Sequence, residues 1–100
     1  MKKETLIDLL DSNADILLLD IREAEELADQ PTILGAIHMP MGKVFIETSK
    51  GAIPKNKHII VFCRTGRRAG IVQRELQAFG YHIDSVEGGL NEYVSTDKLL

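Results

Sequence analysis

The chain has 100 residues, of which 44% are hydrophobic, and its formal net charge is −3. A chain of this length suits one folded domain, and we predict that residues 1–100 form a single domain. The acidic balance gives no general attraction to nucleic acid or to an anionic membrane surface, so neither is expected as a partner.

The cysteine content and the N-terminal residues are evidence on the cellular location of the protein. Cys63 is the only cysteine, which excludes a disulfide within the chain. Glu4, Asp8 and Asp11 interrupt the N-terminal apolar residues, whereas a secretory signal needs an unbroken run of about 7–15 of them. We therefore expect a cytoplasmic protein.

The first third of the chain predicts a helix, a strand and a second helix. Apolar residues recur at helical spacing over residues 5–11, and the apolar run 16–19 is typical of a strand buried on both faces. Asp20 follows this strand, and with Glu23 three residues later it has the spacing of a capping box, so a helix is expected to start there. Pro31 is expected to end that helix.

The middle of the chain predicts two more strands. A short strand that enters a turn is expected within residues 33–41, where Gly35 and Pro40 interrupt the apolar residues. Residues 44–46 fit either a helical turn or a strand. The clearest strand of the chain is 58–62, which is rich in β-branched residues.

The last third predicts a helix after Gly66 that Gly80 ends, a strand over residues 81–86 and a short helix after Gly88-Gly89. Strands that alternate with helices predict an α/β fold, with a parallel sheet covered on both faces. Four apolar residues are expected to share one face of the helix after Gly66: Ala69, Val72, Leu76 and Phe79.

The segment from Cys63 to Arg68 lies between the clearest strand and the clearest helix, at the carboxyl edge of the predicted sheet, where α/β proteins commonly bind ligands. Three of the five arginines of the chain lie within five residues of Cys63. A helix that starts here presents free amides and the positive end of its dipole, and Gly66 allows the backbone to curl around one point. The segment therefore predicts an anion-binding loop that keeps Cys63 as a reactive thiolate.

The alternative for Cys63 is a small, buried, unreactive side chain at the end of a strand. The run of arginines that follows it favours the reactive thiolate. Arg67 and Arg68 are adjacent and point in different directions on a helix, so at most one of them is expected to face the sulfur.

Four segments of the chain are similar, in the same order, to sequence motifs of the rhodanese family. The first is an Asp-x-Arg after a buried strand, at residues 19–22 and followed by Glu25. Each motif is weak alone, but four in this order are specific. The other three are the Gly-Ala-x-x-x-Pro segment at residues 35–40, the catalytic loop at 63–68 and the closing Gly-Gly segment at 87–93.

The resemblance implies a rhodanese-like α/β fold with a central parallel five-stranded sheet and helices on both faces. It also implies a thiosulfate sulfurtransferase without a cofactor. The Cys63 thiolate would take sulfur from thiosulfate or a similar small anionic donor, become a persulfide, and pass the sulfur to cyanide or a thiol, including a protein thiol. On this resemblance Cys63 is catalytic and the other loop residues bind the substrate: Arg64, Thr65, Gly66, Arg67 and Arg68.

Two other functions remain open from the sequence. Cysteine-based phosphatases and arsenate reductases of the same fold use Cys-x5-Arg, whereas Arg68 gives Cys-x4-Arg, a loop that is tight for a phosphate ester. A non-catalytic persulfide carrier, or sulfur-relay module, would need the same thiolate as the enzyme.

The histidines give no sign of a metal centre. His38, His58 and His82 are spread along the chain without the spacing of metal ligands, and there is no second cysteine. We therefore expect no metal site. A histidine base for Cys63 is not expected either, because a thiolate that is activated by neighbouring charge needs no base.

Overall fold

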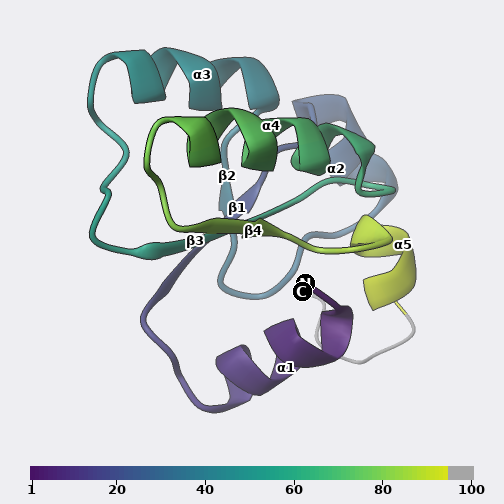
Figure 1. The fold of residues 1–100 in the computed structure, drawn as a ribbon. Helices are drawn as coiled ribbons and strands as arrows, with labels where there is room; N and C mark the ends of the chain where they lie inside the picture. Colours follow the sequence, from purple (N-terminus) through teal and green to yellow (C-terminus); the bar gives the residue numbers. More distant parts are fainter. Residues whose placement is uncertain (95–100) are drawn as a thin grey trace.

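Residues 1–94 are described by the computed structural model, and their strands form one parallel sheet in the order β2-β1-β3-β4 (Figure 1). A helix separates each strand from the next, as the alternation in the sequence predicted. In chain order the elements are α1 (Lys3–Asp11), β1 (Ile16–Asp20), α2 (Ala24–Asp29), β2 (Ile37–His38), α3 (Met41–Ser49), β3 (His58–Phe62), α4 (Arg67–Ala78), β4 (Ile83–Ser85) and α5 (Gly89–Tyr93).

Strands β1 and β3 form the centre of the sheet. They pair in parallel along their full length, from Ile16 beside His58 to Asp20 beside Phe62. Successive side chains of a strand point to opposite faces, and both faces of this sheet are covered. That burial explains why both strands are almost continuously apolar.

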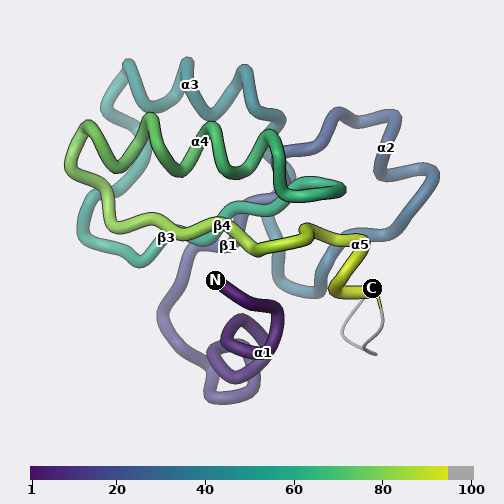
Figure 2. Tube along the Cα trace, turned by 45° about the vertical axis from the view of Figure 1, so that its right-hand side comes forward, coloured from purple at the N-terminus to yellow at the C-terminus, as the bar shows by residue number. Residues whose placement is uncertain are grey.

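Helices cover the two faces of the sheet, which confirms that part of the predicted fold. In Figures 1 and 2, α3 and α4 lie on one side of the sheet and α1 lies on the other. The first core contains Leu19, Val44, Val61, Val72 and Leu76, and the second contains Leu6, Leu18, Ile60, Leu90 and Tyr93.

The prediction of five strands is wrong for residues 1–94, whose sheet has four. Met1 lies beside β4, because its ammonium group donates a hydrogen bond to the Ser85 carbonyl and its own carbonyl accepts one from the Glu87 amide at 2.8 Å. This is the bonding pattern of a parallel strand pair. However, α1 begins at Lys3, so one residue pairs at this edge where a fifth strand would need several.

The second helix starts later than Asp20, so the predicted start is wrong. The N-cap of α2 is Glu23, which forms a capping box with Glu26, and the Glu23 amide donates to Glu26 Oε2 at 2.8 Å. Asp20 stays in β1, since its carboxylate accepts hydrogen bonds from Arg22 and Thr32 and is not free to cap a helix.

Three of the four residues that are predicted to share one face of α4 lie together in the core. Ala69, Val72 and Leu76 are buried, but Phe79 is 62% exposed. The chain leaves the helix at Phe79, its C-cap, and turns at Gly80 with φ of +89°, so the side chain of Phe79 is carried away from the buried face.

Residues 44–46, whose sequence fits either a helical turn or a strand, form part of the helix α3. Val44 is buried, whereas Ile46 is 55% exposed. Within residues 1–94 every helix is too short or too polar to span a bilayer.

Candidate functional site

The Cys63 loop, residues 63–68, runs from the carboxyl end of β3 into the first turn of α4 (Figure 1). Cys63 is 1% exposed, and its Sγ accepts a hydrogen bond from the Gly66 amide at 3.1 Å. Gly66 has a φ of +98°, a backbone conformation that suits glycine, and this turn directs its amide back to the sulfur. Of the backbone amides that are predicted to surround an anion here, the Gly66 amide donates a hydrogen bond to the sulfur.

The three loop arginines do different things. Arg68 donates two hydrogen bonds to the Glu26 carboxylate, at 2.7 and 2.8 Å. Arg64 also lies beside Glu26, with its Nε 3.6 Å from Oε1. Arg67 is exposed and has no ion pair within residues 1–94, and Thr65 is exposed as well. The predicted cluster of three cations is thus divided into two that are held by α2 and one that is open to solvent.

The pKa values in this cluster agree with that division. Hydrogen bonds from Arg68 lower the pKa of the Glu26 carboxyl to about 2 from its ordinary 4.5. The pKa of Arg68 is raised, first by its hydrogen bonds to Glu26 and to a smaller extent by the nearby Cys63. Arg68 therefore lies close to the sulfur and is engaged by a carboxylate at the same time.

Glu26 is the site residue that the sequence analysis missed. The motif comparison singled out Glu25, which is exposed, whereas the next residue reaches the loop. The signal that could have found it is the spacing of Glu23 and Glu26, because the residue at the third position of a capping box is fixed against the helix end.

A fully buried ion pair fixes α2 beneath the loop arginines. Asp20 and Arg22 are both 0% exposed, and Arg22 Nη2 donates to Asp20 Oδ2 at 2.8 Å. Arg22 Nη1 donates to the carbonyl of Glu26 in α2 at 3.2 Å and to that of Gln30, the C-cap of α2, at 3.0 Å. Burial alone would raise the pKa of Asp20, but the hydrogen bonds from Arg22 and Thr32 outweigh it and leave this pKa lowered.

Helix α5 holds the Cys63 loop from the other side. The amides of Leu90 and Asn91 donate to the carbonyls of Cys63 and Arg64, at 2.8 and 3.0 Å. Such a close approach requires a glycine before them, because a Cβ on Gly89 would lie 2.6 Å from the Cys63 carbonyl oxygen. The closing Gly-Gly segment thus supports the loop through its backbone.

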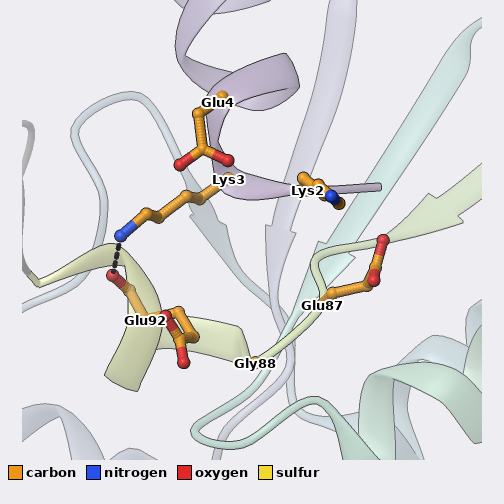
Figure 3. Close-up of a pocket in the computed structure, with 6 residues that line it drawn as sticks. All are labelled: Lys2, Lys3, Glu4, Glu87, Gly88 and Glu92. Atoms are coloured by element: carbon orange, nitrogen blue, oxygen red, sulfur yellow. Dashed lines mark hydrogen bonds between the residues drawn. The ribbon is translucent and has the colours of Figure 1, made fainter.

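A cavity of about 300 Å³ lies near this segment but is a poor site for an anion (Figure 3). Cys63 does not line it. Three carboxylates outnumber two ammonium groups, and Lys3 Nζ donates to the Glu92 carbonyl at 3.1 Å. Its lining residues are Lys2, Lys3, Glu4, Glu87, Gly88 and Glu92.

The parallel sheet and the cysteine loop at its carboxyl edge define a rhodanese-type α/β domain. The chain belongs to the rhodanese-like domain family, whose sequence model matches residues 2–96. A sulfurtransferase of Allochromatium vinosum is 34% identical to it over 88 residues, which cover 87% of this chain and 79% of that protein. The thiosulfate sulfurtransferase PspE of Escherichia coli is 31% identical over 75 residues, which cover 74% of this chain and 70% of that protein.

A solved structure agrees on the fold. The rhodanese-related protein of Thermoplasma volcanium matches with a TM-score of 0.81, at 23% identity, over 95% of this chain and 89% of that chain. The chain is therefore a member of a sulfurtransferase family with the rhodanese-like α/β fold. These relatives do not favour the phosphatase, arsenate reductase or non-catalytic carrier alternatives.

The contact between Gly89 and the loop predicts a costly substitution. Gly89→Ala should destabilise the protein both through its left-handed backbone, with φ of +58°, and through the clash with the Cys63 carbonyl. The matched control is Gly51→Ala, because Gly51 also has a positive φ, +72°, but no atom within 4 Å of its Cβ position. In urea unfolding, Gly89→Ala should lose at least about 1 kcal/mol more than the control, the typical minimum cost of overpacking. Equal losses would mean that the loop yields freely.

The lowered pKa of Glu26 predicts acid sensitivity. The folded pKa of about 2 lies below the ordinary 4.5, so the stabilising contribution is complete above pH 4.5 and is lost as the pH falls toward 2. It amounts to at most about 3.5 kcal/mol, before solvent screening reduces it. Between pH 5 and pH 2, Glu26→Gln should therefore lose less free energy of unfolding than the wild type. The exposed neighbour provides the control: Glu25→Gln should keep the wild-type slope, and parallel curves for all three proteins would contradict the prediction.

Proposed function

We propose that the protein is a thiosulfate sulfurtransferase that moves a sulfane sulfur to a thiophilic acceptor through a persulfide on Cys63. The observation that carries this proposal is the Cys63 sulfur at the carboxyl end of β3, with the Gly66 amide donating to it and Arg68 nearby. Hydrogen bonds and positive charge near a sulfur favour its thiolate form, which is the nucleophile. The similarity to thiosulfate sulfurtransferase PspE supports thiosulfate as the donor.

The first half of the reaction loads the cysteine. The Cys63 thiolate attacks the outer sulfur of thiosulfate, a new S–S bond forms to Cys63, and the S–S bond of thiosulfate breaks. Sulfite leaves with the electron pair, and a persulfide with a terminal negative charge remains on Cys63. The Gly66 amide and the loop amides at the start of α4 would stabilise this charge, as an oxyanion hole stabilises oxygen.

The second half unloads it. Cyanide or a thiolate attacks the terminal sulfur of the persulfide, and the S–S bond to Cys63 breaks. The acceptor leaves as thiocyanate or as a new persulfide, and the electron pair of the broken bond restores the Cys63 thiolate. No external oxidant or cofactor enters either half, and two successive transfers through one residue give ping-pong kinetics. The acceptor can be a small molecule or a protein thiol.

The loop residues would divide the binding of the donor among them. Arg67 is exposed and free of ion pairs within residues 1–94, so it would attract the anionic donor. Arg64 and Arg68 are held by Glu26 and would place their charge at fixed positions around departing sulfite. Thr65 offers an exposed hydroxyl beside them. Because Cys63 is 1% exposed, the loop would have to move for the donor to reach its sulfur.

A cytoplasmic location and a single domain over residues 1–100 stay predictions that accompany this proposal. Both suit an enzyme that meets a diffusing donor and acceptor.

Substitution of Cys63 tests the covalent step. After thiosulfate treatment, intact mass spectrometry should find one added sulfur atom per wild-type chain, and cyanide should remove it with formation of thiocyanate. Cys63→Ser should gain no sulfur and produce no thiocyanate, because a serine hydroxyl forms no persulfide. Far-UV circular dichroism would verify that the variant is folded. Turnover of thiosulfate by folded Cys63→Ser would rule out the mechanism.

Removal of Arg67 tests the recruitment of the donor. Arg67→Ala should raise the KM for thiosulfate about 5- to 10-fold, the effect of losing about 1 kcal/mol of electrostatic attraction, with little change in kcat or stability. Arg74→Ala is the matched control, because Arg74 is exposed on the same helix, two turns further from Cys63. Added salt should narrow the difference between the wild type and Arg67→Ala. Equal KM values for the two variants would show that Arg67 takes no part.

A further inference from the structure

Two histidines and an aspartate gather at the amino-terminal end of β3 and β4, away from the Cys63 loop. His58 begins β3, and His82 directly precedes β4. The parallel register pairs Ile59 with Ile83, which sets His58 beside His82. Asp84 lies two residues after His82 and therefore points to the same face of the sheet.

The side chains of this cluster are in contact with one another. The rings of His58 and His82 stack with their centroids 4.0 Å apart and their planes 2° apart. His58 Nε2 donates to Asp84 Oδ2 at 2.7 Å. One potential ligand atom of each residue lies within 4.8 Å of those of the other two.

We propose that His58, His82 and Asp84 form a binding site for one divalent transition-metal ion of the Zn²⁺ type. Two imidazole nitrogens and one carboxylate oxygen select borderline ions such as Zn²⁺, Co²⁺ or Ni²⁺, whereas Ca²⁺ and Mg²⁺ prefer oxygen ligands alone. Three protein ligands leave at least one position for water. The proposal is independent of sulfur transfer, which uses none of these residues.

Binding an ion requires the stacked rings to separate, because a ring nitrogen binds a metal in the plane of its ring and the two planes are parallel here. Zinc–nitrogen and zinc–oxygen bonds of about 2.0–2.2 Å put neighbouring ligands roughly 3.3 Å apart in a tetrahedral site. His82 is exposed, and its ring has no hydrogen-bond partner within residues 1–94, so it can turn toward the ion. For His58 Nε2 to bind the ion, the ring proton moves to Nδ1, so that the imidazole stays neutral, and Nε2 and the Asp84 oxygen then bind the metal instead of each other.

The sequence spacing predicted no metal site because it took no account of strand pairing. His58 and His82 are 24 positions apart, but the sheet makes them neighbours. The site would link β4, at the edge of the sheet, to the central strand β3. It lies at the opposite end of β3 from Cys63, about 16 Å away for five residues at ~3.3 Å each.

Isothermal titration of the chelator-treated full chain with Zn²⁺, without a histidine tag, tests the site. We expect one ion per chain and an increase in thermal stability with Zn²⁺. His82→Ala should weaken binding by at least about tenfold, the minimum effect seen even for residues that only support a ligand. It should fold, since this exposed ring makes no hydrogen bond within residues 1–94, and a melting curve in chelator verifies that.

Two controls locate the ion. Asp15→Asn removes another exposed carboxylate, which pairs with Lys57 next to His58, and should leave the affinity unchanged. Cys63→Ser should also bind normally, and the Co²⁺ complex of the wild type should lack the near-ultraviolet absorption of a cobalt–thiolate bond. Absence of binding, undiminished binding by His82→Ala, or loss of binding in Cys63→Ser would each overturn the proposal.

Discussion

The ion pair between Asp20 and Arg22 joins three parts of the chain at a point that solvent does not reach. Arg22 binds the Asp20 carboxylate at the end of β1 and the carbonyl of Gln30, the C-cap of α2. Its own carbonyl accepts a hydrogen bond from His38 Nε2 at 2.7 Å, at the end of β2. Losing one partner of a buried pair leaves an uncompensated charge and typically costs about 3–5 kcal/mol. In the intact pair, however, the cost of removing both charges from water offsets much of their attraction, so the pair fixes the position of α2 more than it adds to net stability.

The position of α2 determines where the charged side chains of the Cys63 loop are held. With α2 fixed, Glu26 presents its carboxylate to Arg68 at the first turn of α4, while the amides of α5 hold the loop carbonyls from the opposite side. The loop is thus held between a salt bridge and a pair of backbone hydrogen bonds. A guanidinium group held in this way costs little further ordering when an anion arrives, which is the advantage of a preorganised site.

Local patterns in the sequence predicted the parts of the fold that depend on local chemistry. The apolar run before Cys63 and the glycines at positions 66 and 80 gave the strand, the loop and the limits of α4 correctly. Asp20 was misplaced because it and Glu23 are each spaced as a cap for a Glu three residues later, and only the contact with Arg22 decides between them. The exposure of Phe79 has a similar origin, since helical periodicity cannot specify where the last turn ends.

Features that arise from strand pairing were out of reach of the sequence. Within residues 1–94 the outer edge of β4 has only Met1 beside it, so the sheet has four strands. The contact of His58 with His82 follows from the register of β3 and β4. Both proposed sites lie at the ends of strand β3, which is paired on both sides and cannot shift without breaking two ladders. At its carboxyl end the Gly66 amide donates to the Cys63 sulfur, while at its amino end side chains of β3 and β4 meet. The proposed sulfur transfer and the proposed metal binding can therefore use one rigid strand without sharing a residue.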